Sequence, residues 1–151
     1  MSRISWGVLG AAAIARMRTL PAMSQAPSAE LVAVASRSLP KSAELWAELG
    51  IPTAYGSYEE LLVDPDIDAI YLPLPNHLHC KWAIKSMDAG KHVLCEKPLA
   101  MSGEEIAKLI EVRDRTGMHI EEAFVFRNHP QWAAIAETWN PPRSAPSGVP
   151  S

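Results

Sequence analysis

The sequence predicts an α/β protein built on a doubly wound parallel sheet. Short apolar runs alternate with segments of helical pattern along the chain, which is typical of repeated βαβ units. The first run leads directly into a turn of small residues and then a helix. Two later runs end in proline-containing or charged corners, at the carboxyl ends where open α/β sheets place their ligands.

Bulk composition limits the classes of function. The 151 residues are 48% hydrophobic and 21% charged, so a chain of this length can form one domain with a real core. A net charge of −3 argues against a nucleic-acid surface, and no apolar stretch approaches the roughly 20 residues of a membrane span. Two cysteines do not form a disulfide framework, so we expect a cytoplasmic protein.

The amino end has two interpretations. Residues 3–15 imitate a secretory signal peptide, with Arg3 before an apolar run and small residues after it. Ser5 and two glycines interrupt the run, and a helical pattern follows with no evident mature start. We therefore favour a buried strand and a turn over a cleaved leader.

The first strand, turn and helix give the context of a dinucleotide-binding unit. We expect a strand over residues 4–9 and a helix through about Ser24. In the G-x-G-x-x-G pattern, Gly10 holds the first glycine position, and Ala12 and Ala15 replace the other two. Alanine still permits close approach of a pyrophosphate, which the helix amino end favours. A plain βα turn is the alternative.

The second strand, expected over residues 30–36, addresses cofactor choice. An acidic residue near its end would bind a ribose 2′-hydroxyl. Ser36, Arg37 and Lys41 stand there instead, and arginine pairs well with a phosphate. We predict NADP over NAD, with NAD still possible. The alternative is that the two cations only begin a solvated helix.

The middle of the chain continues the alternation. A helix over 40–49 is closed by Gly50, a short strand follows at 53–55, and Ser57 begins a helix through a capping box. The fourth strand is expected over residues 67–72.

A stiff loop of two prolines follows the fourth strand. Residues 73–79 leave few N–H donors, so a flat cofactor could lie against this loop. Asn76 is expected to cap the helix that runs to Met87.

The stretch 89–100 carries the strongest signal for chemistry. Gly90 ends a helix, residues 92–95 form a brief interior strand, and Pro98 stops further pairing. Glu96 and Lys97 therefore stand at a carboxyl end of the sheet, although neighbouring charges of this kind more often form a solvated ion pair.

The last third completes the sheet. A helix capped by Ser102 ends at Gly117, a sixth strand is expected over 119–126, and a short helix runs to about Trp139. Residues 140–151 are rich in proline and serine and are expected to form a disordered tail.

Metal and nucleophile chemistry are weaker interpretations. His77, His79, Cys80, His92 and Cys95 do not show the paired spacings of zinc sites, so no metal is predicted. Cys80 could be a nucleophile if a helix amino end lowered its pKa, but no paired base is evident.

Four stretches together strongly resemble the amino-terminal half of the Gfo/Idh/MocA oxidoreductases. They are residues 6–15, 55–62, 75–79 and 89–98, the last ending in Glu-Lys-Pro. The resemblance covers about residues 4–132, and residues 122–131 look most like the aldose and dihydrodiol dehydrogenase branch. It implies a Rossmann domain that binds NAD(P), and a sugar-like small-molecule substrate.

The resemblance also implies roles for residues at matching positions. Those near the cofactor would hold its pyrophosphate (Gly10, Ala11, Ala12, Ala13 and Ile14), its adenosine ribose phosphate (Ser36, Arg37 and Lys41) and its nicotinamide half (Leu74, Pro75, Asn76, His79, Glu96 and Arg127). Lys97 would be the catalytic lysine, in a Lys97–Pro98 bond that is often cis in this family.

Family members continue into a second α/β domain, and here the match fails after about Glu137. We expect a dinucleotide-binding domain over 1–127, the start of a connecting helix over 128–139 and the tail over 140–151, with the second domain missing. Such a piece would expose apolar surface and self-associate. The predicted function is the cofactor half of a sugar or polyol oxidoreductase. The alternative is a non-catalytic dinucleotide-binding or sensor module.

Overall fold

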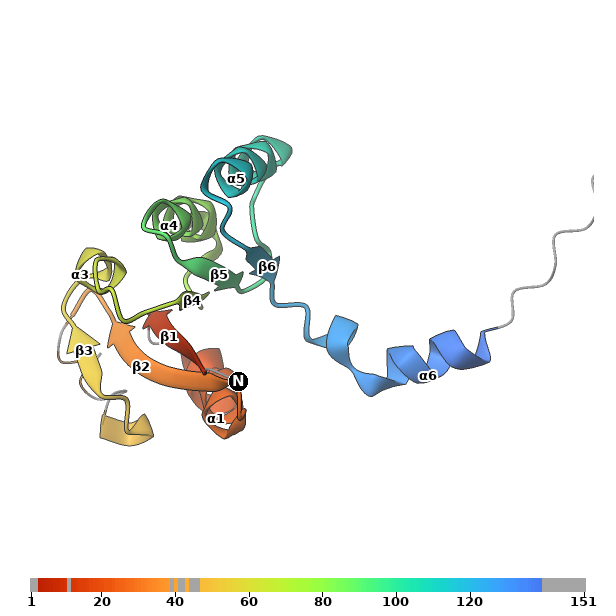
Figure 1. Ribbon diagram of the computed structural model, residues 1–151, viewed down its shortest axis with the longest axis horizontal. Coiled ribbons are helices and arrows are strands. Elements are labelled where there is room, and N and C mark those ends of the chain that lie inside the picture. The colour runs from red at the N-terminus through yellow and green to blue at the C-terminus, as the bar shows by residue number, and fades with distance from the viewer. Residues whose placement is uncertain (1–2, 11, 39, 41–42, 44–46, 140–151) are drawn as a thin grey trace, which may run out of the picture.

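A six-stranded parallel sheet forms the centre of the protein (Figure 1). The computed structural model describes residues 3–139 other than 11, 39, 41–42 and 44–46. The strand order is β3-β2-β1-β4-β5-β6, which confirms the doubly wound fold. The strands are β1 (Ile4–Leu9), β2 (Ala29–Ala35), β3 (Thr53–Tyr55), β4 (Ala69–Leu72), β5 (His92–Cys95) and β6 (Ile120–Glu122).

Helices cover both faces of this sheet. In chain order the described helices are η1 (Ala15–Thr19), α1 (Leu20–Gln25), α3 (Tyr58–Leu62), α4 (Asn76–Asp88), α5 (Gly103–Thr116), η2 (Val125–Asn128) and α6 (Pro130–Thr138), and the last two follow the sheet instead of covering it. The helices α3, α4 and α5 lie on one side, and α1 lies on the other (Figure 1). Each side has its own apolar core.

Alternation along the strands divides residues between the two cores. In β4, Ile70 and Leu72 pack toward α3 and α4, and Tyr71 packs toward η1 and α1. All three side chains are fully buried, as expected for a parallel sheet covered on both faces.

Several predicted helix ends are confirmed. Ser57 Oγ accepts a hydrogen bond from the Glu60 N–H at 3.2 Å, and Ser102 Oγ accepts one from the Glu105 N–H at 3.3 Å. Gly117, which closes α5, has φ 71°. The strand 92–95 was also predicted with its correct bounds.

Three expectations about local structure were wrong. Asn76 does not cap α4: it is the first helical residue, and Pro75 occupies the cap position without a side-chain hydrogen bond. The expected strand 119–126 is only Ile120–Glu122, because the chain turns into the 3₁₀ helix η2 after Phe124. The fourth strand begins at Ala69, two residues later than expected.

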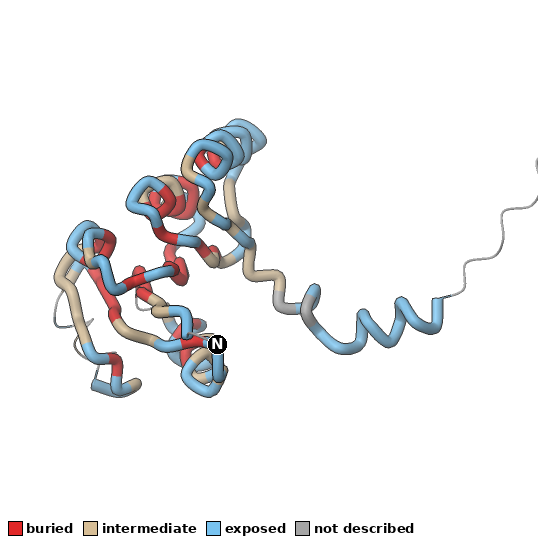
Figure 2. Tube along the Cα trace, viewed as in Figure 1, coloured by how far each residue is buried: buried red, intermediate tan, exposed pale blue. Residues whose placement is uncertain are grey.

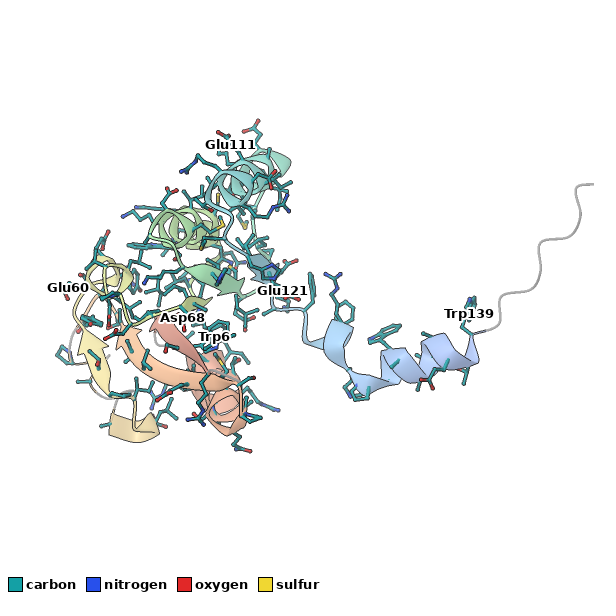
Figure 3. All side chains as sticks on the ribbon, viewed as in Figure 1. Trp6, Glu60, Asp68, Glu111, Glu121 and Trp139 are labelled. Atoms are coloured by element: carbon teal, nitrogen blue, oxygen red, sulfur yellow. The ribbon has the colours of Figure 1, made fainter. Side chains whose placement is uncertain are left out.

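The chain leaves the sheet after β6. Helix α6 projects away from the domain and is exposed along its whole length (Figures 1 and 2). Trp132 and Trp139 on this segment are 46% and 69% exposed, and Figure 3 shows Trp139 at its far end. The predicted tail 140–151 lies outside the described residues, and within them no helix has the length and apolar character to cross a membrane.

Lys91 fastens the turn that precedes β4. Its ammonium group donates to the carbonyl oxygens of Asp64 and Ile67, both at 2.7 Å, although the residue is only 7% exposed. Replacing it with methionine would leave both carbonyls without this donor.

We therefore expect Lys91→Met to lower the free energy of unfolding by on the order of 3 kcal/mol. Urea denaturation would measure this as a lower midpoint at unchanged slope. The matched control is Lys108→Met on the exposed side of α5, expected to change the midpoint little. Equal midpoints for the two variants would contradict the fastening role.

Candidate active site

Two cavities lie at the point where the strand order reverses, between β1 and β4. The larger, of about 740 Å³, extends toward Glu96 and Lys97, and the smaller, of about 450 Å³, extends toward Ser36 and Arg37. Both are lined by Ala12, Pro73 and Leu74. They therefore form one crevice across the carboxyl ends of the strands, which is where open α/β sheets bind ligands.

Gly10 lets the loops after β1 and β4 approach closely. Its φ is 106°, and its N–H donates to the Ala35 carbonyl at 2.8 Å. A Cβ at this position would lie 2.8 Å from Leu74 Cδ2. Because a side chain would displace Leu74, glycine is required by both the backbone and the packing.

The Ser36–Ser38 turn forms the adenosine-side end of the crevice. The Ser36 hydroxyl donates to the Ser38 carbonyl and accepts from the Ser38 N–H, so it stabilises the turn. Arg37 is exposed at the rim. Burial raises the pKa of Tyr58, and the nearby Arg37 guanidinium only partly offsets this rise. The turn thus presents a cation at the mouth of the smaller cavity.

Glu96 is held at the other end of the crevice. Its N–H donates to the Leu72 carbonyl at 3.2 Å, and the Tyr71 hydroxyl donates to its Oε1 at 2.7 Å. The Thr19 hydroxyl of η1 lies 3.0 Å from the same phenol oxygen. Burial, followed by the contact with the Glu96 carboxylate, raises the pKa of Tyr71 and keeps it a neutral donor.

Lys97 follows directly and lines the larger cavity. The Lys97–Pro98 peptide bond is cis, as the family resemblance implied. The Lys97 side chain is exposed, and among the described residues its ammonium group has no hydrogen-bond or ion-pair partner. An amine on a fixed backbone corner, with its donors uncommitted, can exchange a proton with a bound molecule.

Two buried contacts support this corner from behind. His79 is 0% exposed, with Nδ1 2.7 Å from the Pro98 carbonyl oxygen and Nε2 2.6 Å from the Leu74 carbonyl oxygen. A neutral imidazole donates to one of these carbonyls and the doubly protonated ring donates to both. On the other side, Glu122 Oε1 accepts a hydrogen bond from the Leu99 N–H at 2.8 Å.

The cysteines lie below the crevice rather than in it. Burial raises the pKa of Cys95 to about 12 and also raises the pKa of Cys80. Both are therefore thiols at neutral pH, which disfavours Cys80 as a nucleophile. Within the described part of the chain, no three histidine, cysteine or acidic side chains are grouped to hold a metal ion.

The crevice brings together most of the residues expected to contact a cofactor. Those that line a cavity are Gly10, Ala12, Ile14, Ser36, Arg37, Leu74, Pro75, Asn76, Glu96 and Lys97. Ala11 and Lys41 lie outside the described residues. Ala13 begins the helix and lines neither cavity, and neither do the buried His79 and the exposed Arg127, although Phe126 beside Arg127 on η2 does line the larger one.

Sequence reasoning missed several residues at this site. Tyr71 and Glu122 hold the corner, and Thr19, Phe124 and Phe126 contribute to the larger cavity. A tyrosine in an interior strand was a usable signal, because its hydroxyl needs a partner when the ring is buried.

A family model described as an oxidoreductase family with an NAD-binding Rossmann fold matches residues 4–124. The chain belongs to this Gfo/Idh/MocA family. An oxidoreductase of Rhizobium meliloti is 52% identical over 135 residues, which are 89% of this chain and 40% of that protein. The NADP-dependent D-xylose 1-dehydrogenase 2 of Haloferax volcanii is 46% identical over 87% of this chain and 40% of its own length.

Solved structures agree with this membership. A 3-ketoreductase from Actinomadura kijaniata, crystallised with NADP and TDP-benzene, superposes with a TM-score of 0.86 at 37% identity. The superposition covers 91% of this chain and 42% of the ketoreductase. The chain thus spans about 40% of the length of the relatives that it matches.

Gly10 provides a test of how the two loops fit together. We expect Gly10→Ala to lower the free energy of unfolding by about 1–3 kcal/mol through its backbone conformation, with an added penalty from the contact with Leu74. Combining it with Leu74→Ala should remove that added penalty, so the two changes should be non-additive.

The control is Gly117→Ala, which also has a positive φ but meets no atom within 4 Å. This change should be additive with Leu74→Ala in urea denaturation. Additive behaviour of the Gly10 pair as well would show that the two loops do not constrain each other.

Proposed function

We propose that this chain is the cofactor-binding half of an NADP-preferring oxidoreductase that transfers hydride between nicotinamide and a sugar or polyol. The main support is the continuous crevice from Arg37 to Lys97, with Gly10 and Ala12 at its middle. Its length and its small-residue turn suit an extended dinucleotide. In this assignment residues 1–127 are the dinucleotide-binding domain and residues 128–139 begin a connecting helix.

The residues present fit such a cofactor. A pyrophosphate would lie against Gly10 and Ala12, which line the smaller cavity, near the helix that begins at Ala13. Arg37 would pair with the adenosine 2′-phosphate, and Glu96 would accept from the nicotinamide ribose. The apolar side chains of Leu74 and Phe124 would lie against the rings in the larger cavity.

Lys97 would handle the proton. A bound nicotinamide supplies or accepts the hydride, so the protein must supply a proton donor for a carbonyl or an acceptor for a hydroxyl. The Lys97 amine lines the larger cavity, and among the described residues it has no hydrogen-bond or ion-pair partner, so it is the group on this corner that could exchange that proton. The amine would then give its proton to the substrate oxygen in one direction and take it in the other.

Cofactor preference follows from the charge of Arg37. We expect Arg37→Asp to weaken NADPH binding roughly 10–100-fold, because a charge-assisted hydrogen bond is lost, and to leave NADH binding unchanged or stronger. Titration of protein fluorescence with each nucleotide would measure this. Lys108→Glu, which reverses an exposed charge on α5, should not alter the preference, and an unchanged NADPH-to-NADH ratio in Arg37→Asp would refute the assignment.

Catalysis follows from Lys97. In a chain that reduces NADP with a member of an aldose panel, we expect Lys97→Ala to lower kcat by about 10²–10⁴-fold while NADPH affinity changes by only a few-fold. Activity that survives this substitution would remove Lys97 from the mechanism. NADPH binding without turnover of any aldose would instead favour a non-catalytic dinucleotide-binding module.

The expected self-association remains a prediction. The exposed apolar side chains Trp132 and Ile135 on α6 and Trp139 just after it, which are 40–69% exposed, support it.

A further inference from the structure

One peptide group beside the proposed catalytic lysine is held at both of its ends. The carbonyl oxygen of Pro98 lies 2.7 Å from His79 Nδ1, and the N–H of Leu99 donates to Glu122 Oε1 at 2.8 Å. This oxygen and this N–H belong to the same peptide unit. The His79 imidazole and the Glu122 carboxylate therefore hydrogen-bond to the carbonyl and the N–H of one peptide unit.

The two gripping side chains come from different elements. His79 is on α4, and Glu122 is the last residue of β6, on the far side of β5 from β4. Neither lines the larger cavity, so neither is placed to contact a ligand there. What His79 and Glu122 share is that both hydrogen-bond to the backbone corner that carries Lys97.

A gripped peptide fixes the direction of the residues around it. The peptide unit is planar and the proline ring sets φ at position 98, so ψ of Pro98 is the only soft torsion left between this plane and the Lys97–Pro98 peptide. Upstream, the hydrogen bond from the Glu96 N–H to Leu72 fixes the other side of the lysine. The backbone of Lys97 is thus held on both sides, and its side chain alone is free.

We propose that His79 and Glu122 are paired positioning residues that orient Lys97 by clamping the Pro98–Leu99 peptide. The proposal rests on the proposed function, because it assigns Lys97 its role. His79 also lies 2.6 Å from the Leu74 carbonyl oxygen through Nε2, so its ring sets the spacing between two walls of the larger cavity. The test isolates Glu122 because, among the described residues, its carboxylate hydrogen-bonds to this peptide alone.

The test compares Glu122→Ala with Glu122→Gln in the 151-residue chain. Glutamine keeps an oxygen that can accept from Leu99, and alanine does not. The matched control is Glu121→Ala, the neighbouring exposed acid on β6, which pairs with His119 at 3.6 Å (Figure 3). Thermal unfolding would establish that each variant is folded.

The first measurement is the acetylation rate of each lysine, read by mass spectrometry with and without NADPH. Lys108 on α5 serves as the internal reference. NADPH should protect Lys97 in the wild type, in Glu122→Gln and in Glu121→Ala. In Glu122→Ala we expect protection of Lys97 to fall at least about fivefold, with Lys108 unchanged, because one lost hydrogen bond frees the corner.

The second measurement is the affinity for NADPH and for 2′,5′-ADP, which contains only the adenosine half. Glu122→Ala should weaken NADPH roughly three- to fivefold, in line with the few-fold loss expected for Lys97→Ala, and leave 2′,5′-ADP unchanged. Equal weakening of both ligands would mean that the carboxylate only stabilises the domain. That result, unchanged protection of Lys97, or failure of Glu122→Gln to restore the wild-type behaviour would each overturn the proposal.

His79, the other residue of the proposed clamp, provides an independent experiment. Asparagine at position 79 can keep a donor near Pro98, and glutamine can keep one near Leu74. We expect His79→Asn to retain more protection of Lys97 than His79→Gln does. The losses in His79→Gln and Glu122→Ala should not add in the double variant, because both release the same peptide. Additive losses, or the reverse order for the two His79 variants, would contradict the clamp.

The failures of the two proposals are distinguishable. If the wild-type chain binds neither NADPH nor 2′,5′-ADP, or if NADPH leaves Lys97 unprotected, the proposed function fails. If the wild type binds and protects but the Glu122 variants do not differ, only the clamp fails.

Discussion

The reversal of strand order between β1 and β4 is the constraint on which the site depends. At this point the chain leaves β1 toward η1 and α1 on one face and leaves β4 toward α4 on the other. Two connections that depart in opposite directions cannot cover the gap between them. The crevice is therefore a consequence of topology, and the close approach of Gly10 and the Leu74 side chain determines only how narrow it is.

Polar groups beneath the crevice determine its chemistry. Tyr71, His79 and Glu122 are each directed to the corner that follows β5, and their partners lie 25, 19 and 23 residues away along the chain. In a low-dielectric interior these hydrogen bonds hold a backbone that has few ladder contacts after Cys95. The corner is consequently rigid where it touches the domain, and Lys97 remains free where it meets the cavity.

Local signals in the sequence were sufficient for much of the fold. Strand 92–95 was bounded correctly because Gly90 and Pro98 stop regular structure on either side. The strand expected over 119–126 was too long because Phe124 and Phe126 continue an apolar pattern, and nothing local indicates that the chain leaves the sheet after Glu122. Asn76 was misjudged because Pro75 can end the loop without a side-chain cap.

The candidate site divides in the same way. Glu96 and Lys97 were identified because they follow a short interior strand at the carboxyl edge of the sheet and match the Glu-Lys-Pro corner of the family, and the structure brings both to the larger cavity. The supporting contacts of His79 and Glu122 could not be predicted, because each depends on which strands become neighbours. A sequence motif can identify residues that line a site, whereas the residues that support them can be identified only once the order of the strands is known.

The Tyr71 hydroxyl has a consequence for how the domain moves. It forms hydrogen bonds with Thr19, on the helix after β1, and with Glu96, on the corner after β5. Both residues line the larger cavity, from two different elements. Widening the mouth would have to break one of these two hydrogen bonds and leave the buried hydroxyl with a single partner. The Tyr71 hydroxyl therefore links the two sides of the crevice, so the width of the opening is set before a molecule binds.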